Sequence, residues 1–357
     1  MPLKTFKAAA IQAAPIFLDA AATIEKARSL MREAAGAGAE LIIFPEVFVA
    51  GYPYWNWYLS PLEGSAWFPR LQQSAVLVPG PELDRLSEEA ARLGVHVVIG
   101  VNERVPYSLG TVFNTNLIIG PEGLIARHRK LVPTFAEKLS WASGDGSSLR
   151  VHETPFGKLG VLACGENTNT LARYTLLAQG ELVHVANYIA FPFVTNYDMP
   201  EAIRIRAGAH SFEGKIFTIV ACSAMSPELV ATLNPTAEQR EMLSGTPNAF
   251  SGIYGPDGRL VSEPLIDREG IVYAEIDLNC CIEPKQYHDI LGHYNRFDIF
   301  NLEVNRTPLE PIRFREALAR GASQPGIDRA PDEPEDRGPS IIRLRAATEL
   351  SEQGGRR

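Results

Sequence analysis

The 357-residue sequence lacks the motifs by which several classes of enzyme are recognised. Its seven histidines form no HxH or HExxH pair, so a dedicated zinc site is not expected. There is no glycine-rich phosphate-binding loop and no GxSxG motif, which leaves a nucleotide-dependent enzyme or a serine hydrolase with little support. We therefore expect neither a metal ion nor an organic cofactor.

Cysteine is scarce, with Cys164, Cys222, Cys280 and Cys281 the four in the chain. They form no CxxC pair and no dense framework, which suits a reducing compartment. Long apolar runs are missing as well, because none approaches the roughly 20 residues that a transmembrane helix needs. The N-terminus has no basic stretch followed by the apolar core of a signal peptide. These absences predict a cytoplasmic protein without a membrane partner.

Positive charge is also in deficit, since 34 Lys and Arg residues stand against 42 Asp and Glu, a formal net charge of -8. Such a balance argues against a nucleic-acid partner, for which a basic face would be expected. The remaining composition, 45% hydrophobic and 21% charged, is typical of a soluble globular protein. A chain of this length can bury a sizeable core.

Strand-like runs alternate with helical patterns along most of the chain. Asp19 is placed to cap a helix in which apolar residues recur at helical spacing, and Pro81 opens another. Further helical patterns cover residues 171–179 and 201–213. The runs that we predict as strands in this alternation cover residues 6–13, 41–44, 95–100, 159–163, 182–186 and 216–221.

Two similar turn sequences, Gly120-Pro121-Glu122-Gly123 and Gly255-Pro256-Asp257-Gly258, interrupt the alternation. Their recurrence suggests an approximate internal duplication. The simplest architecture is an α/β fold in a single domain, a four-layer α-β-β-α sandwich of two sheets with helices outside. A single doubly wound sheet remains the alternative. The strands that these turns connect are predicted at 111–119 and 124–129, and at 249–254 and 260–262.

The C-terminal segment 320–357 differs in composition from the rest of the chain. It is rich in proline, glycine, acidic residues and arginine, and it contains no aromatic residue. Such a segment cannot bury enough apolar surface to fold alone. We expect one domain over residues 1–319, followed by an extended tail that is disordered or involved in oligomer assembly.

Cys164 closes the apolar run Val161-Leu162-Ala163 and precedes Gly165-Glu166-Asn167. It is therefore expected at the C-terminal end of a strand, where α/β proteins place their active sites. Backbone N–H groups at the start of the following turn could activate its thiol for nucleophilic attack. The alternative is a buried structural cysteine, because free cysteine is among the most buried residue types.

Three charged residues are further candidates. Glu46 follows the apolar run 41–44, and partial desolvation there would raise its pKa toward the value that a general base requires. Lys130 ends a predicted strand and could stabilise developing negative charge, with Glu137 in the following loop. Each residue alone also has a purely structural interpretation. Glu46 could be a solvated loop residue or a helix cap, Lys130 a surface lysine, and Glu137 a solvated partner of Lys138.

Together these segments resemble the nitrilase superfamily, and within it the nitrilase branch, over roughly residues 5–305. Several separated motifs in the right order are far more specific than any one of them. The matching segments are Phe44-Pro45-Glu46, Gly51-Tyr52-Pro53, His128-Arg129-Lys130-Leu131-Val132-Pro133-Thr134, Glu137-Lys138, Trp141, Gly144-Asp145-Gly146, Cys164-Gly165-Glu166-Asn167 and Gly292-His293-Tyr294-Asn295-Arg296.

The resemblance implies an α-β-β-α sandwich and a Cys-Glu-Lys catalytic set with a second glutamate. By resemblance Tyr52 and Trp141 are substrate-binding candidates, although simple core aromatics remain an equal alternative. Gly165 stands where many nitrilases have tryptophan, which predicts less bulk beside the nucleophile and a wider pocket. Matched position by position, the catalytic residues are Cys164, Glu46, Lys130 and Glu137.

The nitrilase branch is indicated by Glu166 and Asn167, because amidase and carbamoylase members usually place an aspartate two residues after the cysteine. The resemblance implies hydrolysis of a small organic nitrile by water, through thioimidate and thioester intermediates on Cys164. It also implies a homo-oligomer, a dimer that extends into spirals or filaments. An amidase or cyanide-hydrolysing enzyme of the same superfamily and a catalytically silent binding protein remain the alternatives.

Overall fold

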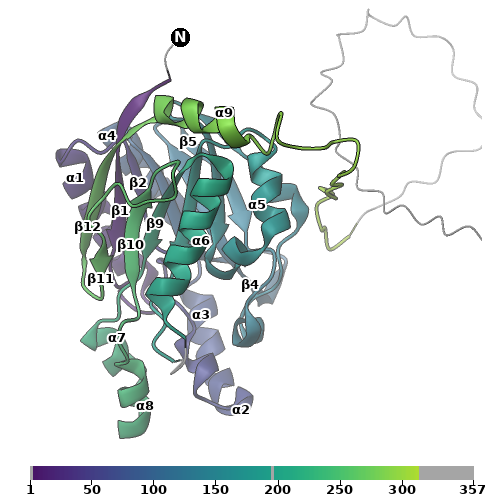
Figure 1. Ribbon diagram of the computed structural model, residues 1–357. Helices are drawn as coiled ribbons and strands as arrows, with labels where there is room; N and C mark the ends of the chain where they lie inside the picture. Colours follow the sequence, from purple (N-terminus) through teal and green to yellow (C-terminus); the bar gives the residue numbers. More distant parts are fainter. Residues whose placement is uncertain (1–2, 194–196, 313–357) are drawn as a thin grey trace, which may run out of the picture.

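Two six-stranded sheets with helices packed against them form the body of the protein in the computed structural model (Figure 1). The structure describes residues 3–193 and 197–312. The predicted four-layer α-β-β-α sandwich is confirmed, and the alternative of one doubly wound sheet is wrong. The domain boundary predicted at residue 319 and the tail 320–357 lie outside the described residues.

The two sheets have the same construction, three parallel strands in the centre with antiparallel strands on both sides. This likeness agrees with the internal duplication suggested by the sequence. The first sheet has the order β12 (Gly270–Asp277), β1 (Thr5–Gln12), β2 (Leu41–Ile43), β3 (His96–Val105), β4 (Ser108–Gly120), β5 (Gly123–Arg129). The second has the order β11 (Leu265–Ile266), β10 (Phe250–Tyr254), β9 (Phe217–Cys222), β8 (Val183–Tyr188), β7 (Gly157–Ala163), β6 (His152–Thr154).

The central strands are apolar on both faces because each face meets another layer. In β1, Phe6 and Ala8 belong to the core between the two sheets, where they meet residues of β7, β8 and β9. Ala9 and Ile11 alternate with them and pack under the helices of the first sheet. Successive side chains of a strand point to opposite faces, so a strand buried on both sides reads as a continuous apolar run.

The outer helices follow the sequence signals. In α1 (Ala20–Gly36) the Asp19 side chain accepts a hydrogen bond from the backbone N–H of Ala22. The second helix, α4 (Pro81–Leu93), begins at a proline and ends at Gly94, which has the left-handed φ of 68°. Helices α5 (Thr170–Leu177) and α6 (Met199–Gly214) lie beside the second sheet (Figure 1). The remaining α-helices are α2 (Pro61–Gly64), α3 (Phe68–Ser74), α7 (Pro227–Thr232), α8 (Ala237–Leu243) and α9 (Ile282–His288).

One predicted hairpin differs from the structure. The first turn sequence joins β4 to β5 as expected, but the strand predicted at 260–262 does not form. Leu260 makes only an isolated bridge with Tyr254, and β11 pairs with β10 instead. Pro264 follows this stretch closely and has no N–H to donate, so the ladder cannot continue through it. Strands β6, β11 and β12 were not predicted.

No helix in residues 3–193 and 197–312 is long and apolar enough to cross a membrane.

Candidate active site

The four residues predicted to be catalytic all lie just after strands or in the loops that follow them. Glu46 follows β2, and Lys130 follows β5 directly. Glu137 lies in the short 3-10 helix η3 (Phe135–Leu139), and Cys164 opens the 3-10 helix η5 (Cys164–Thr168) at the end of β7. The structure brings all four together: Lys130 contacts both Glu46 and Glu137, and Cys164 lies close enough for all three charges to affect the pKa of its thiol.

The ammonium group of Lys130 lies between two carboxylates. Its Nζ atom is 2.8 Å from Glu46 Oε1 and 2.7 Å from Glu137 Oε2, and all three residues are at most 2% exposed. Burial favours the neutral amine, yet the charges of Glu137 and Glu46 outweigh it and hold the pKa of Lys130 well above its usual value. The lysine is therefore a fixed cation, and a solvated surface position is excluded.

Glu46 keeps one oxygen available. Its Oε1 atom accepts hydrogen bonds from Lys130 and from Asn114 Nδ2, the latter at 2.7 Å. Its Oε2 atom is buried and has no hydrogen-bond partner among the described residues. Burial raises the pKa of Glu46, although the positive charge of Lys130 opposes the shift. A carboxylate with a raised pKa and an unpaired buried oxygen is well prepared to take up a proton.

Cys164 is held in an unusual backbone conformation. Its φ is 46°, in the left-handed region that residues other than glycine rarely adopt. Asn167 Nδ2 donates to the carbonyl oxygens of Leu162 and Cys164, both at 3.1 Å. Burial and the negative charge of Glu46 raise the pKa of the thiol well above its usual value, while Lys130 lowers it. The resting group is a thiol, so a nucleophilic reaction requires a base to remove its proton.

Glu137 uses both oxygens in fixed contacts. Its Oε2 atom accepts hydrogen bonds from Lys130 and, at 2.7 Å, from the backbone N–H of Thr134. Its Oε1 atom accepts a hydrogen bond from the Tyr52 hydroxyl at 3.0 Å, and that hydroxyl accepts one from Trp57 Nε1 at 2.8 Å. A solvated pair with the exposed Lys138 is excluded, and this arrangement orients the carboxylate toward Lys130.

The three residues predicted to bind substrate each lie beside a different member of the predicted catalytic set: Tyr52 beside Glu137, Trp141 beside Lys130 and Gly165 beside Cys164. Tyr52 and Trp141 are buried and meet edge to face at 5.5 Å between ring centroids. The centroid of the Trp141 ring also lies 5.8 Å from Lys130 Nζ. The two rings therefore form a wall beside the charged cluster, by which we mean Glu46, Lys130 and Glu137. A Cβ atom at Gly165 would lie only 2.9 Å from Thr134 Oγ1. A larger side chain there would have to displace Thr134.

An aromatic cluster that sequence reasoning missed lies beyond Tyr52. Trp57, which donates to Tyr52, packs against Phe191 at 4.6 Å and stacks on Phe193 at 6.1 Å between ring centroids. The abundance of aromatic residues in the segment 52–58 was the available signal.

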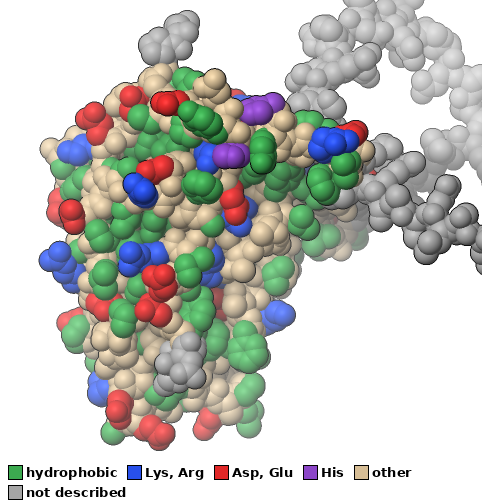
Figure 2. All heavy atoms as spheres, in the orientation of Figure 1, with side chains coloured by type: hydrophobic (Ala, Val, Ile, Leu, Met, Phe, Trp, Pro, Cys, Tyr) green, Lys and Arg blue, Asp and Glu red, His purple; other side chains and the backbone are tan. Residues whose placement is uncertain are grey.

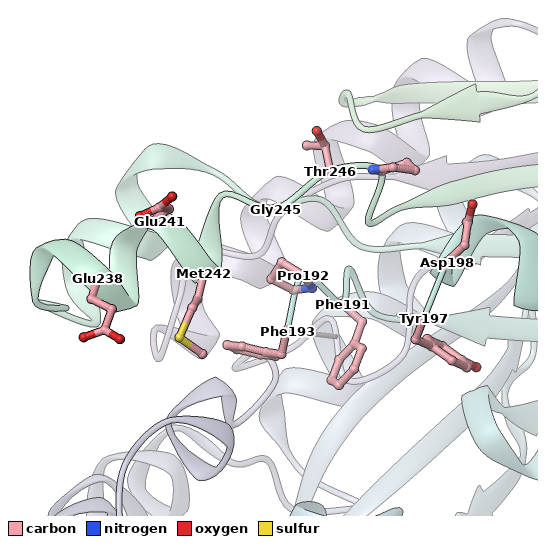
Figure 3. A pocket seen from close by; sticks show the side chains of 11 residues that line it. Phe191, Pro192, Phe193, Tyr197, Asp198, Glu238, Glu241, Met242, Gly245 and Thr246 are labelled. Atoms are coloured by element: carbon pink, nitrogen blue, oxygen red, sulfur yellow. The ribbon is translucent and has the colours of Figure 1, made fainter. Parts of the chain in front are cut away.

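A cavity of about 630 Å³ opens on the far side of this cluster. Figure 3 shows Met242 of α8 pointing toward Phe193 on its wall. None of the four predicted catalytic residues lines this cavity, so it is separate from the site that contains them. The acidic residues of its rim are Asp198, Glu238 and Glu241.

A buried group of Glu181, His184 and His210 contains the residue types of a metal site. Glu181 Oε1 lies 2.7 Å from His184 Nδ1, and Oε2 lies 3.1 Å from His210 Nε2. His184 Nε2 lies 2.8 Å from Asn167 Oδ1. Sequence analysis missed this group because its members come from the loop before β8, from β8 itself and from α6. The same atoms that would bind a cation already pair with one another, so we assign the group to buried hydrogen bonding.

Comparison with known proteins identifies the family. The sequence model of the carbon-nitrogen hydrolase family matches residues 7–286, a span that includes Cys164 and the three residues of the charged cluster. The chain belongs to the carbon-nitrogen hydrolase family. The resemblance to the nitrilase superfamily predicted from the sequence is therefore confirmed.

Individual members of the family are similar over most of their length. This carbon-nitrogen hydrolase is 38% identical to an aliphatic nitrilase of Rhodococcus rhodochrous, over 86% of this chain and 85% of that one. It is 32% identical to a nitrilase of Paraburkholderia phymatum, over 92% and 94%. The fold is similar to that of Nit3 from Saccharomyces cerevisiae, a member of branch 10 of the nitrilase superfamily, with a TM-score of 0.63 at 20% identity, covering 80% of this chain and 95% of that one.

Replacing Lys130 by methionine should destabilise the hydrolase strongly, because two buried carboxylates then lose their shared cation. We expect the free energy of unfolding at pH 7, measured by urea denaturation, to fall by about 3–5 kcal/mol. The loss should shrink as the pH falls toward 5, since burial already raises the pKa of Glu46 and its protonation removes one unpaired charge.

The matched control is Lys138→Met, which removes an exposed lysine from the same loop. It should change the free energy of unfolding by no more than about 0.5 kcal/mol. Equal effects of the two substitutions would contradict the assignment of Lys130 as the centre of a buried charge cluster.

Proposed function

We propose that this carbon-nitrogen hydrolase is a nitrilase, which converts an organic nitrile and water into a carboxylic acid and ammonia. The observation that carries the proposal is the similarity to proteins named nitrilases over most of both chains, at 38% and 32% identity. The site supports it, because a protonated thiol lies in the electrostatic field of a buried carboxylate with an unpaired oxygen.

In the first half of the proposed reaction, Glu46 removes the proton of Cys164. The thiolate sulfur then forms a bond to the nitrile carbon, and the nitrile nitrogen takes up the proton to give a thioimidate. A nitrile has no leaving group, so covalent attachment divides a difficult hydrolysis into easier additions. The unpaired Glu46 Oε2 is the atom that we assign to this proton transfer.

In the second half, Glu46 removes a proton from water, and the resulting hydroxide adds to the thioimidate carbon. Glu46 returns this proton to the nitrogen to complete the tetrahedral intermediate. The hydroxyl proton of the intermediate then also passes to the nitrogen, and the carbon–nitrogen bond breaks to expel ammonia and leave a thioester on Cys164. A second water molecule attacks the thioester carbon, releases the carboxylic acid and returns the proton to the thiol.

Lys130 stabilises the negative charge that develops in each addition. Its ammonium is fixed before the reaction by Glu46 and Glu137, so little reorganisation is needed when the charge forms. Glu137 acts through Lys130, because its oxygens are already used by Lys130, Thr134 and Tyr52. Tyr52 and Trp141 shape the wall on the side of the lysine.

We also propose that the protein forms a homo-oligomer. Large hydrophobic side chains are exposed on the outer helices, including Leu171 on α5 and Ile205 and Phe212 on α6. Figure 2 shows hydrophobic side chains spread over the face on which these helices lie. These apolar side chains would lose contact with water in an interface between subunits.

Replacing Cys164 by alanine should abolish ammonia release from every nitrile in a panel of aliphatic, aromatic and arylacetonitrile substrates and cyanide. Cys222→Ala is the matched control, because Cys222 is a buried cysteine of β9 that takes no part in the proposed reaction. It should keep most of the turnover.

The same panel, paired with the corresponding amides, tests the amidase alternative. A wild-type protein that releases ammonia from amides but from no nitrile is an amidase, and the proposed function then fails. Turnover by purified Cys164→Ala at the wild-type rate contradicts the assigned nucleophile.

Replacing Glu137 by glutamine should lower kcat at least tenfold, a barrier change of about 1.4 kcal/mol. The substitution keeps the shape of the side chain but removes one of the two charges that hold Lys130. Lys138→Gln is the control, because it lies next in the chain and is exposed. If both variants hydrolyse nitriles at close to the wild-type rate, Glu137 has no role in the reaction.

A further inference from the structure

Glu166 is a buried carboxylate for which the proposed reaction gives no role. It lies two residues after Cys164 in η5 and is 6% exposed. Its Oε1 atom accepts a hydrogen bond from the backbone N–H of Leu131 at 2.6 Å, and its Oε2 atom accepts one from the backbone N–H of Ala163 at 2.8 Å. Leu131 directly follows Lys130, and Ala163 directly precedes Cys164.

These two hydrogen bonds connect the two sheets. Lys130 follows β5 at the edge of the first sheet, while Cys164 follows β7 in the second. The contacts of Lys130 with Glu46 and Glu137 involve segments that follow strands of the first sheet. Glu166 is bonded to the backbone beside both reacting groups, so its side chain fixes the lysine segment relative to the cysteine segment.

A buried histidine keeps the Glu166 carboxylate ionised. His128 Nε2 lies 3.3 Å from Oε1 and 3.1 Å from Oε2 of Glu166, and because an ionised carboxylate only accepts hydrogen bonds, this nitrogen carries the proton. Burial acts against the charged form of each partner, but the attraction between them outweighs it. The pKa of His128 is raised and that of Glu166 is lowered.

Polar and basic groups surround His128. Its Nδ1 atom lies 3.1 Å from Ser148 Oγ. Burial and the charges of Arg150, His128 and Arg306 lower the pKa of the neighbouring His152. The groups that lower the pKa of Glu166, against the opposing effect of burial, are His128 and the two backbone N–H donors. An ionised Glu166 can therefore accept both backbone hydrogen bonds near neutral pH.

We propose that Glu166 is a positioning residue that sets the placement of Lys130 relative to Cys164, with His128 as the partner that holds its carboxylate in place. The inference rests on the proposed function, since it assigns the residue that aligns the nucleophile with the cation. Glu166 does not touch the substrate. A displacement of the two reacting groups by about 1 Å lowers a rate on the order of 100-fold.

Two substitutions of Glu166 distinguish the effect of its negative charge from the effect of its side-chain length. Glutamine in place of Glu166 has nearly the same shape, but its amide NH2 then faces one of the two backbone N–H donors. Aspartate keeps the charge, but its shorter side chain cannot reach Leu131 and Ala163 together. Neither variant can make both hydrogen bonds, so aspartate should not rescue the loss caused by glutamine.

The experiment measures kcat and KM for nitrile hydrolysis and the rate at which iodoacetamide alkylates Cys164, followed by peptide mass spectrometry. For Glu166→Gln we expect kcat to fall about 100-fold, KM to change less than about threefold, and alkylation to slow at least tenfold. The control is Glu89→Gln, which removes a buried carboxylate of α4 that pairs with Arg28 and Arg92 far from the site. It should leave kcat near the wild-type value.

The proposal is overturned if kcat of Glu166→Gln stays within threefold of wild type. It is also overturned if kcat falls only in proportion to the fraction of protein that is unfolded. If this variant does not fold, His128→Gln provides the test, because it keeps Glu166 but removes the charge that lowers its pKa. Protonation of Glu166 should then occur at higher pH, and the acid limb of the kcat profile should shift upward. An unshifted limb overturns the proposal.

Failure of the proposed function gives a different result. A wild-type protein that hydrolyses no nitrile removes the nitrilase assignment, whereas the alkylation rates of Cys164 in the wild-type and Glu166→Gln proteins still test the positioning role. Equal alkylation rates, with both proteins folded, overturn it whatever the substrate is.

Discussion

The buried ammonium of Lys130 between Glu46 and Glu137 is the interaction on which the site depends. Placing a single charge in a protein interior costs several kcal/mol, and the cost is recovered only when partners satisfy it with good geometry. Here two carboxylates do so at 2.8 and 2.7 Å. Burial, together with the negative charge of Glu46, raises the pKa of the neighbouring Cys164 thiol, which stays protonated until Glu46 accepts its proton.

The sandwich positions the site because it brings several strand ends together. Lys130 and Glu46 follow strands of the first sheet, and Cys164 follows a strand of the second. The apolar core between the sheets fixes their separation, while the buried carboxylate of Glu166 bonds to the backbone on both sides. Packing thus sets the coarse geometry, and a small number of buried hydrogen bonds set the fine geometry.

Much of the fold could be predicted from periodicity, because the central strands are apolar on both faces and the helices carry clear caps. The short strands β6 and β11 contain too few residues to show a periodic pattern. Residues 260–262 form only the isolated bridge between Leu260 and Tyr254, because Pro264 cannot donate a hydrogen bond to extend it. Local sequence could not show that Glu137 is buried, since that depends on a loop folding back onto Lys130. The family motifs supplied that information, whereas the contacts of Trp57 and of His184 with His210 arise only from tertiary packing.

The covalent intermediate is the most direct test of this account. A nitrile that is turned over is mixed with the protein, the reaction is quenched in acid at times from milliseconds to seconds, and the peptides are analysed by mass spectrometry. The account predicts a substrate-derived thioimidate or thioester on the peptide that contains Cys164, which disappears as the nitrile is consumed. Steady nitrile turnover with that peptide unmodified at every time, or with the adduct on Cys222, Cys280 or Cys281, would contradict it.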